Sequence, residues 1–134
     1  MALLQAQGLG MVIAYWCVLV AALLPYLIVV PAKAGKRFDN HAPRAQLATA
    51  QGWQQRLNWA HLNAFEAFAP FAAAVIIAQQ LHAPQQEIDG LALAFIGLRI
   101  LHPVFYALDK PTLRSAVWAG AYVCVLGLFL ISVR

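Results

Sequence analysis

The sequence has little charge. Of its 134 residues, 10% are charged and 63% are hydrophobic, and the mean hydropathy is +0.69. A soluble domain of this length carries about 25% charged residues. The deficit excludes an ordinary soluble domain, and the length fits one domain, residues 1–134. The composition therefore indicates a small polytopic membrane protein.

Cysteine is also scarce. Cys17 and Cys124 each lie inside an apolar run, and no Cys-x-x-Cys or Cys/His spacing is present. This pattern excludes a disulfide framework and gives no zinc site. We expect both thiols to be small buried apolar groups, and we expect no metal.

Strand-like alternation is missing, whereas long apolar runs are plentiful. Each run is long enough to span a hydrocarbon core of about 30 Å, so we expect an all-α bundle of four transmembrane helices. The first run resembles a signal peptide, but it is longer than the usual apolar core of one and no Lys or Arg precedes residue 33. A retained first helix is the better interpretation. The predicted spans are approximately 9–30, 57–81, 88–108 and 112–133.

Acidic residues number five against nine Lys and Arg, which gives a net charge of +4. The basic residues lie between the apolar runs, so they indicate topology and headgroup contact rather than nucleic-acid binding. The positive-inside rule then places the first and third loops in the cytoplasm and both termini outside. The first and third loop regions contain Lys33, Lys36, Arg37, Arg44, Arg56, Lys110 and Arg114, against Arg134 at the opposite end.

Polar residues interrupt the second predicted span. At 100° per residue, Arg56, Trp59, Asn63 and Glu66 fall within about 80° of one another on a helix, and His61 points roughly the other way. The four residues therefore form one face. Because a charged side chain in the membrane is costly, this face is expected to meet another polar face.

The third predicted span carries such a face. Arg99, His102 and Tyr106 lie within about 60° of one another, and Arg99 and Glu66 both lie about 15 Å from the cytoplasmic ends of their helices. We therefore predict that Glu66 and Arg99 form an intramembrane pair. The fourth span opens with Arg114 and Ser115 at the same end.

The polar residues leave two interpretations open. Polar residues often hold membrane helices together, for about 1 kcal/mol each. The full set, however, lies in the cytoplasmic half of three helices, and the outer half has no comparable set. That asymmetry indicates a polar, arginine-rich cavity open to the cytoplasm, which suits a small polar anion. The surrounding lipid suits a hydrophobic co-substrate.

Two stretches of the chain resemble one known family. RLNWAHLNAFEAFAP, residues 56–70, is similar to the signature E-R-x-x-R-A-H-x-N-x-x-E-x-x-x-P of MAPEG proteins, the membrane-associated proteins in eicosanoid and glutathione metabolism. RILHPVFYALDKPTLRS, residues 99–115, is similar to that family's R-x-x-H-x-x-x-Y followed by a Pro and an R-S pair. The resemblance covers roughly residues 52–134 and looks like a bacterial member.

The resemblance implies a homotrimer of four-helix bundles in the bacterial inner membrane, with the active site toward the cytoplasm. It implies a transferase or peroxidase that uses glutathione as co-substrate on lipophilic compounds. Arg114, with Ser115 beside it, would face the sulfur, where a guanidinium near a thiol favours the nucleophilic thiolate. The residues implied to bind glutathione or to line its pocket are Arg56, Asn63, Glu66, Arg99, His102 and Tyr106.

The chain departs from the family pattern at three positions. Gln55, Trp59 and Trp118 stand where members often have Glu, a second Arg and Tyr. These changes leave room for an alternative, a non-catalytic lipid-binding or scaffold member of the same fold. A small multidrug exporter is a weaker interpretation, because those proteins centre on a carboxylate in the first span and this first span has no charge.

Overall fold

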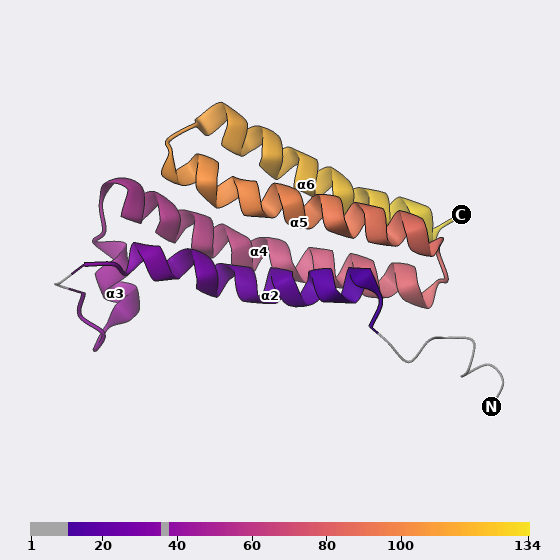
Figure 1. Ribbon diagram of the computed structural model, residues 1–134, viewed down its shortest axis with the longest axis horizontal. Helices are drawn as coiled ribbons and strands as arrows, with labels where there is room; N and C mark the ends of the chain where they lie inside the picture. Colours follow the sequence, from indigo (N-terminus) through magenta and orange to yellow (C-terminus); the bar gives the residue numbers. More distant parts are fainter. Residues whose placement is uncertain (1–10, 36–37) are drawn as a thin grey trace.

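Antiparallel helices account for nearly all of the computed structural model, which describes residues 11–35 and 38–134. The helices form one elongated bundle, and α3 lies at the same end as the α5–α6 turn (Figure 1). No strand occurs in the described part of the chain. The elements are α2 (Ile13–Ala32), α3 (Pro43–Ala48), α4 (Gly52–Gln80), α5 (Gln85–Ala107) and α6 (Pro111–Ser132).

Within the described residues, α2, α4, α5 and α6 are each long and apolar enough to cross a membrane. The predicted all-α membrane fold is therefore confirmed. The spans differ from prediction mainly at the first one, where α2 continues through Pro31 to Ala32. Residues 9 and 10 of that predicted span lie outside the described residues. Pro111 stands at the start of α6, where its missing N–H costs nothing.

The alanine- and glutamine-rich segment before the second span does not form one continuous helix with it. A separate six-residue helix, α3, ends at Ala48. The chain then breaks, and α4 begins at Gly52, whose φ of 62° lies in the left-handed region. Glycine takes up this conformation without a steric penalty, which explains why the break falls there. Residues 52–56 extend the second span beyond its predicted start at residue 57.

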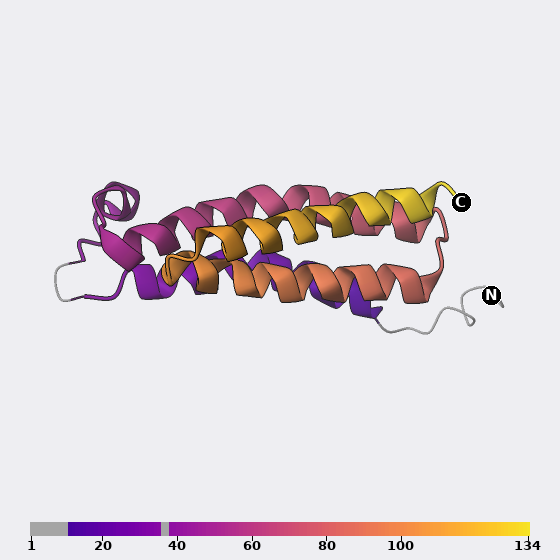
Figure 2. The same cartoon turned by 90° about the horizontal axis from the view of Figure 1, so that it is seen from above.

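The helices form two layers. In Figure 2, α4 and α6 lie on one side of the bundle, and α2 and α5 lie on the other. The α5–α6 and α2–α4 pairs pack most extensively, whereas α4 and α6 touch less. The α4–α6 seam is therefore the place where the bundle has room for a cavity.

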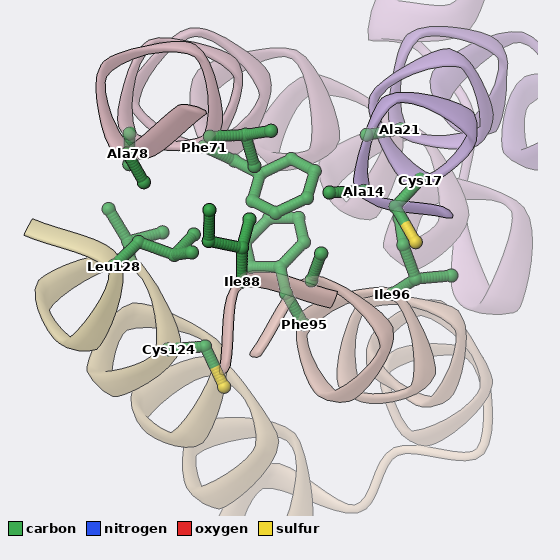
Figure 3. Close-up of a cluster of buried hydrophobic side chains, with 14 of the residues drawn as sticks. Ala14, Cys17, Ala21, Phe71, Ala78, Ile88, Phe95, Ile96, Cys124 and Leu128 are labelled. Carbon is green, nitrogen blue, oxygen red and sulfur yellow. The ribbon is translucent and has the colours of Figure 1, made fainter. Parts of the chain in front are cut away.

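The main apolar core fills the half of the bundle away from α3. Phe71 and Phe95 stack face to face, with ring centroids 3.9 Å apart and planes within 5° (Figure 3). Ile88 and Leu128 are fully buried beside them. This packing joins α4, α5 and α6, and it closes the membrane interior beyond the polar residues.

Close approach of α5 and α6 depends on two glycines. A Cβ added to Gly120 would lie 3.1 Å from Leu98 Cδ1, and one added to Gly127 would lie 3.3 Å from both Leu91 methyl carbons. Small residues let membrane helices approach closely and gain dispersion energy. The α5–α6 pair is thus held tightly, which fixes the two helices that carry most of the polar residues.

Two side chains cap helices other than their own. Asp89 on α5 accepts a hydrogen bond from the Ala14 N–H at 3.0 Å, in the first turn of α2. Arg56 on α4 donates to the carbonyls of Tyr106 and Ala107, at 3.1 and 3.0 Å, in the last turn of α5. Each charge has the sign that stabilises its helix end. These bonds fix the helices at both ends of the bundle.

Candidate functional site

A cavity of about 450 Å³ opens on the α4–α6 seam, near the end of the bundle where α4 and α6 begin. We call this end the basic end, because among the described residues it carries Lys33, Arg44, Arg56, Lys110 and Arg114. Helix α5 forms the back wall of the cavity. Its lining residues are Trp59, Leu62, Asn63, Glu66, His102, Tyr106, Arg114, Ser115 and Trp118.

Arg114 lies in the first turn of α6 with its guanidinium 4.5 Å from the Tyr106 ring centroid, a cation–π contact. Among the described residues, no carboxylate lies within 4 Å of it and no hydrogen bond restrains it. The neighbouring Trp59 ring also packs near Tyr106, at 6.2 Å between centroids. Arg114 is therefore positioned by an aromatic face, and its N–H donors remain available to an anion.

His102 forms part of the back wall. Its side chain is 2% exposed, and its ring meets Tyr106 edge to face at 5.5 Å. Its Nδ1 is buried without a hydrogen-bond partner in the described part of the chain. Buried polar atoms are nearly always paired in native proteins, so this unpaired nitrogen is an exception, and its burial keeps it out of contact with the cavity.

Asn63 links the two charged residues for which the sequence predicted a direct pair. Arg99 donates to Asn63 Oδ1 at 2.8 Å, and Asn63 Nδ2 donates to Glu66 Oε2 at 3.2 Å. Glu66 and Arg99 form no ion pair within 4 Å, so the predicted direct pair is wrong, although the two lie at a similar level. Arg99 is buried and Glu66 is exposed, and the amide one turn earlier on α4 lies between them.

A second cavity of about 240 Å³ continues along the seam, deeper into the bundle. It shares Asn63, Glu66 and Trp118 with the first, so the two form one cleft that we call the α4–α6 cleft. The deeper part is more apolar, apart from Arg99. The cleft therefore has a polar end near Arg114 and a more apolar end within the membrane-spanning part of the helices.

Most sequence-predicted site residues meet in this cleft. The upper cavity brings together Asn63, Glu66, His102, Tyr106, Arg114 and Ser115, and the deeper one adds Arg99. Arg56 lines neither cavity, because its guanidinium is engaged with the end of α5. His61 points away as predicted: its Nδ1 lies 2.7 Å from the Pro25 carbonyl oxygen of α2.

Sequence reasoning missed the apolar half of the lining. Trp118 was noted only as a departure from the family pattern, yet it lines both cavities. Leu62 and Tyr122 were not singled out at all. A usable signal was present, because Arg114, Trp118 and Tyr122 are spaced by four and share one face of α6. That face meets the polar face of α4.

Comparisons with known proteins place the chain in one family. In the described residues, no cluster of His, Cys, Asp and Glu is arranged to hold a metal ion. No curated protein and no solved structure matches the chain. The model of the MAPEG family matches residues 13–134, which is nearly the whole chain. The chain belongs to the MAPEG family, membrane proteins of glutathione and eicosanoid metabolism.

Proposed function

We propose that this protein is a membrane-bound glutathione transferase or peroxidase that acts on lipophilic substrates. The observation that carries the proposal is Arg114: an unpaired guanidinium in the first turn of α6, facing Asn63 and Glu66 across a cavity of about 450 Å³. The volume lies within the range of small-molecule sites. Ser115 beside Arg114 adds a hydroxyl donor at the same place.

The lining residues fit glutathione in part. Glu66 offers a carboxylate for the α-ammonium group, and Asn63 offers an amide within hydrogen-bond reach of the same carboxylate. The ring of His102 forms part of the back of the cavity. Among the residues that the structure describes, Arg114 is the one cation that lines the upper cavity. We assign it to the sulfur, because a guanidinium beside a thiolate lowers the thiol pKa and favours the nucleophile.

The chemistry requires little else from the chain. The thiol proton passes to water, and Arg114 with the Ser115 hydroxyl stabilises the thiolate. With a carbon electrophile, the thiolate forms a C–S bond while the leaving group departs with its electron pair. With a lipid hydroperoxide, the thiolate forms an S–O bond to the terminal oxygen while the O–O bond breaks, and the alkoxide takes a proton to give the lipid alcohol. A second glutathione thiol then attacks the sulfur of the resulting sulfenic acid, which gives glutathione disulfide and water. The more apolar part of the α4–α6 cleft would hold the lipophilic substrate beside the sulfur.

Calorimetry and ultraviolet spectroscopy test this proposal together. Glutathione is titrated into purified detergent-solubilised protein, and the absorbance of bound thiolate is followed against pH. We expect binding in the wild type with a bound-thiol pKa below about 8.5, its usual value. In Arg114→Ala the bound-thiol pKa should rise by about one unit or more, because the stabilising charge is gone.

Arg44→Ala is the matched control, since Arg44 is exposed on α3 and lines neither cavity. It should leave binding and thiol pKa unchanged. A thiol pKa that is the same in wild type and Arg114→Ala would contradict the role of Arg114. No heat at millimolar glutathione would contradict glutathione as the ligand.

One observation favours a second candidate, a non-catalytic lipid-binding member of the family. Trp59 and Leu62 give the upper cavity two apolar walls, while glutathione carries two carboxylates that need cations. If glutathione does not bind, the same titration with vesicle lipids replaces it. Lipid binding that survives Arg114→Ala would support this second function.

We further propose a homotrimer in the bacterial inner membrane, with the basic end in the cytoplasm and both termini outside. The family resemblance supports the trimer. Glu66 supports it physically, because this carboxylate is exposed on the lipid-facing seam of a single chain, where burial by another copy would lower its cost. Native mass spectrometry from detergent checks the trimer, and a monomeric mass would contradict it.

A further inference from the structure

Aromatic rings wall the deeper part of the α4–α6 cleft. Phe95 lies on the α5 side, and Trp118 and Tyr122 lie on the α6 side, stacked on each other with planes within 20° and centroids 5.6 Å apart. Flat walls of this kind favour a flat guest, since stacked and edge-to-face ring contacts add to the burial of area. The deeper chamber therefore favours ligands that contain aromatic rings.

The volume of the deeper chamber limits the guest. An apolar cavity of roughly 150 Å³ accommodates benzene, and this chamber holds about 240 Å³. One ring, or two fused rings, fills such a space, and larger ring systems exceed it. The inner wall cannot retreat easily, because Phe95 is 2% exposed and stacks on Phe71 at 3.9 Å. A larger guest cannot gain room on this inner side without displacing the core, so the room available depends on the α6 side.

Trp118 stands at the junction of the two chambers. It is the α6 residue that lines both, four residues after Arg114 and four before Tyr122. Four residues correspond to about 6 Å along a helix. A sulfur held by Arg114 would thus lie roughly one ring length from the guest in the deeper chamber. The 45% exposed indole is an adjustable part of the wall, because α6 holds it from one side.

We propose that the lipophilic substrate is a compact aromatic electrophile with a body of one or two fused rings, and that Trp118 sets this size limit. The inference rests on the proposed transferase function and specifies its substrate class. The reacting carbon projects from the ring toward Arg114. With an aryl vinyl ketone, the thiolate forms a C–S bond to the terminal alkene carbon. The alkene electrons move to the enolate, which takes a proton from water to give the ketone thioether.

The test is a size series. Phenyl, naphthyl and pyrenyl vinyl ketones are compared as substrates, with glutathione at saturation and a fixed detergent concentration. In the wild type we expect kcat/KM to be similar for phenyl and naphthyl and about tenfold or more lower for pyrenyl, because a pyrenyl body exceeds the volume between Phe95 and Trp118. Trp118→Ala should raise the pyrenyl-to-phenyl ratio about tenfold, and Trp118→Phe should raise it less.

Trp16→Ala is the matched control. Trp16 is an exposed indole on α2 that lines neither chamber, so its removal should leave the ratio unchanged. Comparing variants at one detergent concentration cancels the partition of the pyrenyl compound into micelles. An unchanged ratio in both Trp118 variants would overturn the assignment of Trp118, and equal kcat/KM for all three ketones would overturn the size limit.

Binding of the saturated aryl ethyl ketones without glutathione separates this inference from the proposed function. These compounds have no electrophilic alkene, so calorimetry reports the chamber alone. Phenyl and naphthyl binding without pyrenyl binding, in a protein that turns over none of the vinyl ketones, would support the size limit and contradict the transferase. Turnover of all three vinyl ketones without size discrimination would support the transferase function and contradict the size limit.

Discussion

Arg99 is the most deeply buried charged residue in the described part of the chain. It is 3% exposed, and one side-chain hydrogen bond, from its guanidinium to Asn63 Oδ1, is present. A buried charge that loses its partner is strongly destabilising, because the desolvation cost stays while the compensation is lost. The amide therefore matters more to Arg99 than the carboxylate of Glu66 does.

A double-mutant cycle tests whether Asn63 contributes more than Glu66 to the stability of the buried Arg99. We expect Asn63→Ala and Arg99→Met each to lower the free energy of unfolding, and the double variant to cost about 1–3 kcal/mol less than the sum. Glu66→Gln should cost less than Asn63→Ala, because a glutamine oxygen can still accept from Asn63. Unfolding in mixed micelles measures all four. Additive single costs would contradict the Arg99–Asn63 bond.

At this scale the sequence predicted which residues are near one another but not their bonds. Helical periodicity brought Glu66 and Arg99 to one level, and the structure agrees. Periodicity treats a side chain as a direction, so it could not tell that the shorter amide of Asn63 would stand between them. Opposite charges were paired in the prediction because Coulomb attraction is easier to foresee than hydrogen-bond geometry.

At the scale of elements, Arg56 links α4 to the last turn of α5. Its side chain donates to two carbonyls of the last turn of α5, where orphan acceptors and the negative end of the helix dipole coincide. The sequence resemblance implied that Arg56 belongs to the glutathione network. The structure gives it a place outside the cleft lining and a bond that holds the back wall.

Arg56→Ala is therefore expected to lower stability rather than to abolish the thiolate. Loss of charge-assisted hydrogen bonds to carbonyls should cost about 1–2 kcal/mol of unfolding free energy. Chemical unfolding in micelles measures the cost, and the ultraviolet thiolate signal measures the site. Arg44→Ala, an exposed arginine on α3, serves as control with little effect on either. A large loss of thiolate with full stability would contradict this assignment.

The long helices were predictable from the sequence because apolar length is a strong signal. The short helix α3 was not, since four of its six residues are alanine, glutamine or leucine, which also recur in the helix that follows. Gly52 decides the break, and a lone glycine in a helix-forming stretch is a weak signal. The apolar cleft walls were missed for a related reason: Trp118 and Tyr122 look like ordinary membrane aromatics until α4 is placed opposite them.

At the scale of the whole molecule, the charges are distributed unevenly between the two ends. Five described Lys and Arg residues lie at the basic end, whereas the opposite end carries Glu87, Asp89 and Arg134, with Glu87 and Arg134 forming an exposed pair at 3.6 Å. An exposed pair of this kind contributes little to stability. Membrane proteins are oriented by an excess of Lys and Arg on one side, which here is the basic end.

A reporter fused after Arg134 tests the orientation. We expect alkaline phosphatase to be active there and green fluorescent protein to be dark, as in the periplasm. The same reporters inserted after Lys110, in the α5–α6 turn, should give the opposite result. A cytoplasmic signal after Arg134 would invert the topology and place the cleft mouth outside.

The cap on α2 has a consequence for biosynthesis. Asp89 lies 75 residues after Ala14, the residue whose N–H it accepts. At synthesis rates of about 5–20 residues per second, roughly 4–15 s pass between the two. During that interval the first helix enters the membrane with an orphan donor in its first turn, and α5 must arrive before the turn is closed. Helix α2 is thus synthesised before α4 and α5, but the hydrogen bond in its first turn forms only after α5 has been made.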